Sequence, residues 1–238
     1  EKFSFTQYSN LITNKPWIYM TLVAICTNFF NGFRYAAAGY MITYCLGGDV
    51  TVGALIINYT VFMAFGEVTC MIFGGLSPAF TRWAGSKRKA FVYSSAICAI
   101  SSIAYFFIPM DPAYIWVMVV ISIITSIGAG LYSPLIWSMY ADVSDYATEK
   151  YGTSSTGLIF SSGTMAQKFG GAISGSLIAL LLGMAGLISS TDPVTGETIV
   201  TITDAESVKT MVWSLFSLFP AIVAVIMGLL AYMFPLKK

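Results

Sequence analysis

The most restrictive feature of this sequence is a series of apolar segments, each long enough to cross a lipid bilayer as a helix. A spanning helix needs roughly 20 mainly apolar residues. Six segments reach that length: Pro16–Leu46, Val52–Trp83, Ala90–Pro109, Ala113–Tyr140, Gly152–Ile188 and Val208–Phe234. Charged residues make up only 10% of the chain, whereas a soluble domain carries about 25%. The sequence therefore predicts an all-α integral membrane protein with six transmembrane helices in contact with membrane lipid.

Several function classes are excluded by the residue types present. The chain has no His and a formal net charge of +1, so it lacks the commonest metal ligand and any basic field for nucleic acid. Its four cysteines lie inside apolar segments without CxxC pairing, which favours buried packing over a metal site or a disulfide. No nucleophile–base pair or phosphate-binding loop is present. We therefore expect no enzyme, no cofactor, no metal site and no nucleic-acid partner.

Basic residues are concentrated on one side of the predicted membrane topology. If both chain ends lie on the same side, that side carries Lys2, Lys15, Arg82, Lys87, Arg88, Lys89, Lys150, Lys237 and Lys238. Only Lys209 lies on the opposite side. Cytoplasmic loops carry the excess of Lys and Arg, so we expect both ends to be cytoplasmic. On the opposite side, Ser189–Ser207 is expected to form a small hairpin around Thr195-Gly196-Glu197. Pro134 and Pro220 lie inside apolar segments, where we expect them to kink the helices.

Three charged residues lie well inside the predicted spans, away from their ends: Arg34, Glu67 and Lys168. A charge at mid-bilayer costs about 2.5–3.5 kcal/mol on insertion scales, so it is retained when it is paired, hydrated or used. Helical spacing places Lys168 on one face with small and polar residues, namely Ser161, Thr164, Gly171 and Gly175. This pattern favours a cation that lines a cavity near a substrate or ion site. The alternative is a structural lysine held by carbonyls or an acid.

Arg34 and Glu67 lie at similar depths on the first and second predicted helices. The favoured interpretation is a buried ion pair that joins the two helices. In the alternative, Arg34 binds substrate hydroxyls and Glu67 binds a proton or a sodium ion. The third and sixth spans, represented by Phe91–Pro109 and Met211–Phe234, contain no Asp, Glu, Lys or Arg. This distribution favours two three-helix repeats whose third members face lipid.

Other polar and aromatic residues are weaker candidates. Asn31 has an amide that can bind sugar hydroxyls, and Tyr132 and Trp137 have rings that can stack on a sugar. Ordinary helix packing is the alternative for all three residues.

Charged residues also gather at the predicted cytoplasmic face. Asp142 and Asp145 lie one helical turn apart, and Lys87 and Arg88 lie on the same membrane side. These four residues are candidates for a cytoplasmic gate, with a solvated helix end as the alternative.

Five short motifs lie along the chain: Asn31-Gly32-Phe33, Gly85-Ser86-Lys87-Arg88, Ala141-Asp142-Val143-Ser144-Asp145-Tyr146, Thr156-Gly157-Leu158-Ile159-Phe160-Ser161 and Ala166-Gln167-Lys168-Phe169-Gly170. This series resembles one transporter family, the glycoside–pentoside–hexuronide:cation symporters of the major facilitator superfamily. The motifs occur in the family's order, and the resemblance covers nearly the whole chain. It is strongest between Ser133 and Gly186.

The resemblance implies a specific architecture. Residues 16–238 would form helices seven to twelve of a twelve-helix carrier, and residues 1–15 would belong to its central cytoplasmic loop. The N-terminal half of the same transporter is then the main partner, and the bacterial inner (plasma) membrane is the expected location.

The same resemblance implies roles for individual residues. Lys168 would lie beside the coupling-cation site, and Thr164 and Gln167 near the sugar. The cation-binding aspartates would lie in the first half, outside this chain. The expected activity is symport of a sugar or glycoside with Na⁺ or H⁺. Two alternatives stay open: a non-transporting six-helix scaffold or receptor, and a facilitator-type carrier for a lipid or another amphiphile.

Overall fold

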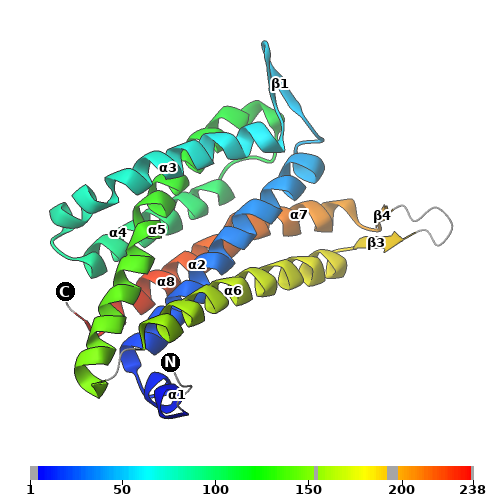
Figure 1. Ribbon diagram of the computed structural model, residues 1–238. Helices are drawn as coiled ribbons and strands as arrows, with labels where there is room; N and C mark the ends of the chain where they lie inside the picture. The colour runs from blue at the N-terminus through cyan, green and yellow to red at the C-terminus, as the bar shows by residue number, and fades with distance from the viewer. Residues whose placement is uncertain (1–4, 153–154, 192–197, 237–238) are drawn as a thin grey trace.

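The chain folds into an elongated bundle of helices (Figure 1). The computed structural model describes residues 5–152, 155–191 and 198–236. Its helices are α1 (Phe5–Ile12), α2 (Lys15–Tyr40), α3 (Tyr59–Ala84), α4 (Lys87–Phe106), α5 (Ile115–Tyr151), α6 (Thr156–Met184), α7 (Ala205–Phe216) and α8 (Leu218–Met233). The segment expected to be a loop before the first span thus contains the short helix α1.

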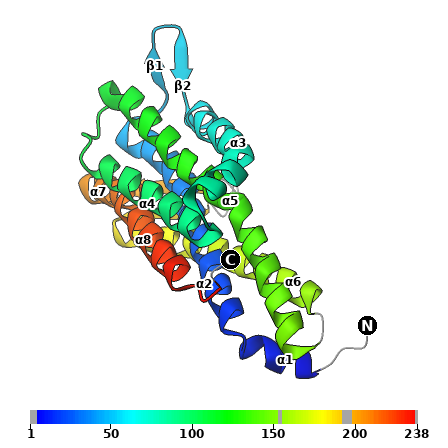
Figure 2. The ribbon, with the colours of Figure 1, turned by 90° about the vertical axis from the view of Figure 1, so that its left-hand side faces the viewer.

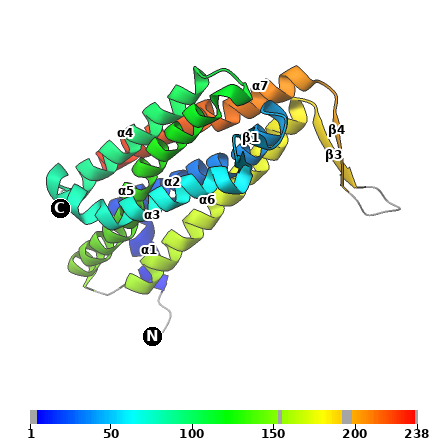
Figure 3. The same ribbon diagram turned by 90° about the horizontal axis from the view of Figure 1, so that it is seen from above.

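The long helices pack mainly in neighbouring pairs. Helix α3 packs against α5, α6 packs against α2, and α4 lies between α5 and α8. Helices α4 and α8 run side by side along one side of the bundle (Figure 2). Seen from above, α2 lies between α6 and the group formed by α4, α5 and α8 (Figure 3). Helix α2 is therefore surrounded by other helices over much of its length.

Five helical stretches of the described chain have the length and apolar composition needed to cross a membrane. They are α3, α4, α5 with the turn before it (Pro112–Tyr151), α6, and α7 together with α8 (Ala205–Met233). Five of the six predicted spans therefore contain a helix that is long and apolar enough to cross a membrane. Helix α2 has 26 residues, but Asn28, Asn31 and Arg34 lower its apolar character.

The start of the second predicted span was wrong. Val50–Val52 (β1) and Leu55–Ile57 (β2) form an antiparallel hairpin, and Gly53 makes the turn with a φ of 62°. β-Branched residues dominate both strands, which explains why this apolar segment is extended. Helix α3 begins after Asn58, whose side chain accepts a hydrogen bond of 2.9 Å from the backbone N–H of Val61. Asn58 is therefore a helix cap.

The hairpin predicted after α6 is confirmed. Leu187–Thr191 (β3) and Thr198–Ile202 (β4) pair antiparallel, with Leu187 opposite Ile202. The turn residues Thr195–Glu197 lie outside the described residues.

The two prolines expected to kink helices differ in their effect. Helices α7 and α8 are separated at Ser217, three residues before Pro220, which lacks the N–H that would continue the helix. The Ser217 hydroxyl donates to the Trp213 carbonyl at 2.6 Å. Pro134, in contrast, lies inside α5 without ending it. Near it, the Ser77 hydroxyl of α3 donates to the Leu131 carbonyl at 2.7 Å.

Glycines allow several helices to approach each other closely. A Cβ added at Gly170 of α6 would overlap the backbone carbonyl of Ile25 in α2. A Cβ at Gly130 of α5 would lie 2.5 Å from the carbonyl oxygen of Cys70 in α3. Small residues at such contacts are typical of membrane helix packing, because van der Waals contact replaces the hydrophobic effect there.

Candidate functional site

The polar stripe predicted on α6 lies on the surface of the bundle. Lys168 is exposed near the middle of α6. The residues predicted to share its face are exposed as well: Ser161, Thr164, Gly171 and Gly175. The opposite face of α6, with Gly163, Ala166, Gly170 and Ser174, is buried. No described part of this chain therefore covers the ammonium group of Lys168.

The two residues next to Lys168 in the predicted sugar site differ in exposure. Thr164 is exposed, and its hydroxyl donates to the Phe160 carbonyl at 3.1 Å. Gln167 is half-buried. Both side chains remain available to a ligand that approaches the exposed face. The Thr164 oxygen can still accept a hydrogen bond, and the Gln167 amide forms no hydrogen bond with any described residue.

The expected ion pair between Arg34 and Glu67 is wrong. Within the described ranges, the ion pair present joins Lys87 and Asp142. Glu67 is exposed on α3 and lies beside the Tyr35 hydroxyl, whereas Arg34 is only 7% exposed. Equal depth in the membrane does not bring two side chains together, because their directions around the helix axes also matter. Tyr35, the residue after Arg34, is the one whose direction matches that of Glu67.

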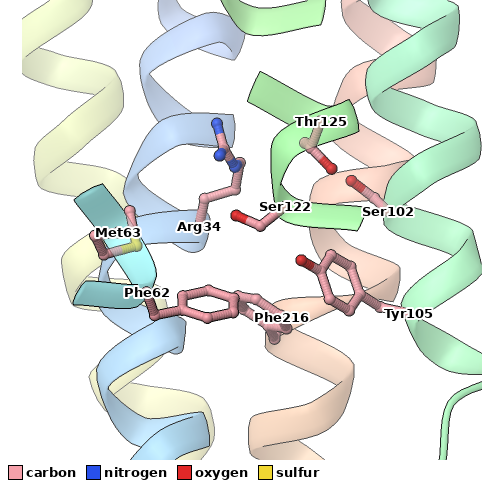
Figure 4. Close-up of a pocket in the computed structure, with 8 residues that line it drawn as sticks. All are labelled: Arg34, Phe62, Met63, Ser102, Tyr105, Ser122, Thr125 and Phe216. Carbon is pink, nitrogen blue, oxygen red and sulfur yellow. The ribbon is translucent and has the colours of Figure 1, made fainter. Parts of the chain in front are cut away.

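Arg34 turns into the bundle instead (Figure 4). Its Nη2 donates to the Ser126 hydroxyl at 2.8 Å, and its guanidinium carbon lies 5.8 Å from the centre of the Phe30 ring. Gly66 provides the space, since a Cβ there would lie 2.8 Å from Ser126 Oγ and 3.7 Å from Arg34 Nη2. No sequence pattern singled out Gly66 as the residue that directs Arg34 inward.

A small cavity adjoins the Arg34 side chain, with room for one water molecule at most. Polar and aromatic side chains surround it: Phe62, Met63, Ser102, Tyr105, Ser122, Thr125 and Phe216. The hydroxyls give this buried cation a polar environment without a carboxylate. For Arg34 to bind substrate hydroxyls, as the sequence suggested, the bundle would have to open at this level.

The aromatic candidates occupy different environments. Tyr132 is 1% exposed, its hydroxyl donates to Asn31 Oδ1 at 3.4 Å, and its ring lies 5.4 Å from that of Phe91. It therefore joins α2, α4 and α5. Trp137 is 37% exposed and stacks on Phe160 with an interplanar angle of 5°. Of these two aromatic residues, Trp137 has the ring surface available to a ligand.

Two of the four gate candidates meet at the start of α4. The Lys87 ammonium donates to both carboxylate oxygens of Asp142, at 2.8 and 2.7 Å, and to the Ser138 carbonyl at 3.3 Å. Ser86 caps α4 by accepting a hydrogen bond of 3.2 Å from the backbone of Lys89, which positions Lys87 on the first turn. Asp145 is exposed and forms no ion pair with any described residue. Both partners of the bridge belong to one bundle, so it ties α4 to α5.

Arg88 points away from the gate residues. Its guanidinium carbon lies 5.0 Å from the centre of the Tyr232 ring, and Nη1 lies 3.5 Å from the Phe234 carbonyl oxygen. Arg88 therefore contacts the end of α8.

The Lys87–Asp142 bridge predicts a measurable coupling. Lys87→Gln and Asp142→Asn should each lower the free energy of unfolding, because the side chains are only 29% and 13% exposed. The double variant should lose less than the sum of the two, with a coupling energy of about 0.5–1 kcal/mol. Chemical unfolding of the four proteins in detergent measures this energy. Asp145→Asn is the matched control and should stay within about 0.5 kcal/mol of the parent. Strictly additive losses would contradict the bridge.

Comparison with known proteins places this geometry in a wider context. Residues 3–238 match the family described as MFS/sugar transport protein. The chain is 26% identical over 218 residues to the inner membrane symporter YicJ of Escherichia coli, covering 92% of this chain and 43% of that protein. It is 29% identical over 161 residues to an uncharacterized 29.9 kDa protein in the crtE 3′ region of Pseudescherichia vulneris, covering 68% of this chain and 55% of that protein. A putative sulfoquinovose importer of Escherichia coli is 21% identical over 178 residues, covering 75% of this chain and 36% of that protein. The chain thus spans about half, or less, of the length of these relatives.

Proposed function

The chain belongs to the MFS/sugar transport protein family, and from this membership we propose that the protein containing it carries a sugar or glycoside across the membrane together with a cation. This chain supplies the second half of the carrier, with both of its ends in the cytoplasm. The two halves rock against each other around a site near the middle of the membrane, so that the site opens to each side in turn. Relatives named as symporters support cotransport.

Helix α2 acts as the sixth spanning helix in this proposal. Its 26 residues extend about 39 Å at a rise of about 1.5 Å per residue, which exceeds the hydrocarbon thickness of about 30 Å. It contacts α5, α6, α7 and α8, so much of its surface faces protein. A helix in that position tolerates Asn31 and Arg34, because neighbouring helices satisfy polar groups that lipid cannot.

The exposed polar stripe around Lys168 is the observation that supports the proposal most strongly. An ammonium group facing hydrocarbon costs about 2.5–3.5 kcal/mol or more, yet Lys168 is exposed on this bundle among small and polar neighbours. Glu67, exposed on α3, presents a second charge. Both charges require a partner of protein or water, and the other half of a carrier, enclosing an aqueous cavity, supplies it.

The candidates near the exposed face of α6 and on the neighbouring helices then have defined roles. Lys168 adjusts the affinity of the neighbouring cation site through its charge, and Thr164 and Gln167 provide hydrogen bonds for sugar hydroxyls. Trp137 offers its exposed ring to the sugar, while Asn31 and Tyr132 set the spacing of the helices behind it. Glu67 is a candidate for binding the coupling ion, which is Na⁺ or H⁺.

Transport by the full-length protein in sealed vesicles tests the proposal. A panel of labelled sugars and glycosides is supplied with an inward Na⁺ gradient, an inward proton gradient or neither gradient. We expect one sugar to accumulate with one ion gradient, and an ionophore for that ion to abolish accumulation. Specific binding without uptake would instead support a receptor, and gradient-driven movement of a lipid analogue would support an amphiphile carrier.

A further inference from the structure

An apolar groove runs between α4 and α8 on the side of the bundle where these helices lie together (Figure 2). Residues of α4 line one wall and residues of α8 the other, among them Val92, Ala96, Ile103, Ala224, Gly228 and Tyr232. The span from Val92 to Ile103 is about 16 Å at about 1.5 Å per residue. One leaflet of the hydrocarbon core is about 15 Å thick, half of about 30 Å. The groove therefore has the length of a lipid acyl chain in a single leaflet.

Small residues produce the groove, and almost all of the surface exposed in it is apolar. A Cβ on Gly228 would lie 3.2 Å from the Cβ of Ser95, so the missing side chain allows α8 to approach α4. The Ser95 hydroxyl donates to the Phe91 carbonyl at 2.8 Å within its own helix. Ala96 is exposed and adds no bulk. The floor of the groove is thus apolar and shallow, and an alkyl chain fits it without leaving an unsatisfied hydrogen bond.

A cation lies at one end of the groove. Arg88 is one helical turn before Val92 and packs over Tyr232, a residue of the groove wall, at 5.0 Å. Its one hydrogen bond in the described chain, to the Phe234 carbonyl, is long at 3.5 Å, and no acid pairs with it among the described residues. A planar guanidinium with several free N–H groups is suited to a phosphate.

We propose that the α4–α8 groove binds an anionic glycerophospholipid, with one acyl chain in the groove and the phosphate held by Arg88. This inference rests on the proposed membrane orientation, which puts Arg88 at the cytoplasmic leaflet, where anionic lipids attract basic residues. A second apolar groove, between α3 and α5, contains Val61, Ala64 and Val68 but no basic residue among those that line it. The second groove therefore provides an internal comparison, since it has a similar apolar character without the cation.

Retention of lipids by the full-length protein tests the site. The purified protein is incubated with equal amounts of phosphatidylglycerol and phosphatidylcholine, and the retained lipids are counted by native mass spectrometry. Both lipids carry a phosphate, but the choline group neutralises phosphatidylcholine, whereas phosphatidylglycerol keeps a net negative charge. We therefore expect about a fivefold preference for phosphatidylglycerol, the order of the attraction between one basic residue and an anionic lipid. Arg88→Gln should reduce this preference to near equality. Ala96→Phe, which fills the groove, should lower retention of both lipids, whereas the matched Ala64→Phe in the α3–α5 groove should leave the preference unchanged.

Two further measurements complete the test. One distinguishes a lipid headgroup from free phosphate, and the other uses the unaltered protein, so its result does not depend on whether a variant folds. Excess inorganic phosphate should not displace the lipid; displacement would show a headgroup-only anion site and overturn the groove. With the unaltered protein, phosphatidylglycerol carrying a photoreactive acyl chain should label peptides of α4 and α8 more than peptides of α3 and α5. Equal labelling of both grooves, or parent-like retention in Arg88→Gln and Ala96→Phe, would overturn the proposal. None of these outcomes depends on whether the protein transports a sugar.

Discussion

Lys168→Val is expected to reduce cation-driven sugar uptake by the full-length protein about 100-fold. The side chain is exposed in the middle of α6, and the proposed cavity places it near the carboxylates that bind the coupling ion. A unit charge about 6 Å away in a medium with an effective dielectric constant of about 20 contributes about 2.8 kcal/mol. Without this charge the carboxylates bind protons more tightly. They then exchange the coupling ion less readily during the transport cycle. Initial uptake rates in vesicles measure the effect.

Two matched variants separate the role of the charge from the role of the fold. Lys168→Arg keeps the positive charge and should recover part of the uptake, although the guanidinium has a different shape. Lys89→Val removes an exposed lysine of α4 and should leave uptake unchanged. If Lys168→Val transports normally and with unaltered ion dependence, the residue has no role in coupling.

Gly170→Ala is expected to destabilise the protein by about 1–3 kcal/mol, the usual cost of forcing extra atoms into a packed interior. The added Cβ would overlap the backbone carbonyl of Ile25 in α2, and backbone atoms cannot rotate away as a side-chain end can. Helices α2 and α6 would have to separate. Thermal or chemical unfolding of the full-length protein in detergent measures the loss.

Gly171→Ala is the matched control for this substitution. It changes the next residue of the same helix, where a Cβ would meet nothing within 4 Å. Both substitutions gain the same intrinsic helix preference of about 0.8–1 kcal/mol, so the difference between them isolates the contact with α2. Equal stability of the two variants would show that the helices are not packed as closely as described.

The lengths of the apolar segments and the family motifs allowed much of the fold to be predicted. The helices now called α3 to α8 overlap the predicted apolar segments, although α5 continues to Tyr151, beyond the predicted end at Tyr140. The interruption at Ser217 agrees with the helix-breaking effect of Pro220. The limits of Val52–Trp83 were wrong because an apolar segment rich in β-branched residues satisfies a length criterion equally well as helix or strand. Only the turn at Gly53 and the cap at Asn58 distinguish the two.

The candidate site was predictable only where a single helix determines it. The α6 stripe follows from the helical period, and all of its predicted members are exposed. The pairing of Arg34 with Glu67 required the relative rotation of two helices, which depth in the membrane does not provide. The inward direction of Arg34 depends on the missing side chain of Gly66 and on the Ser126 hydroxyl of a third helix. Such three-helix arrangements leave no periodic signal in the sequence.

The central position of α2 affects how this helix can enter the membrane while the chain is being synthesised. This helix carries Asn28, Asn31 and Arg34 and is synthesised before α6 and α8, the helices against which it packs most extensively. While it emerges alone, the insertion machinery meets a segment whose Arg34 opposes transfer into lipid. In the proposed role of α2 as the sixth spanning helix, its stable insertion must await later helices or rely on helices that the proposed first half of the carrier has already placed in the membrane. Mutations that weaken α6 would then impair the membrane integration of a segment that was translated long before it.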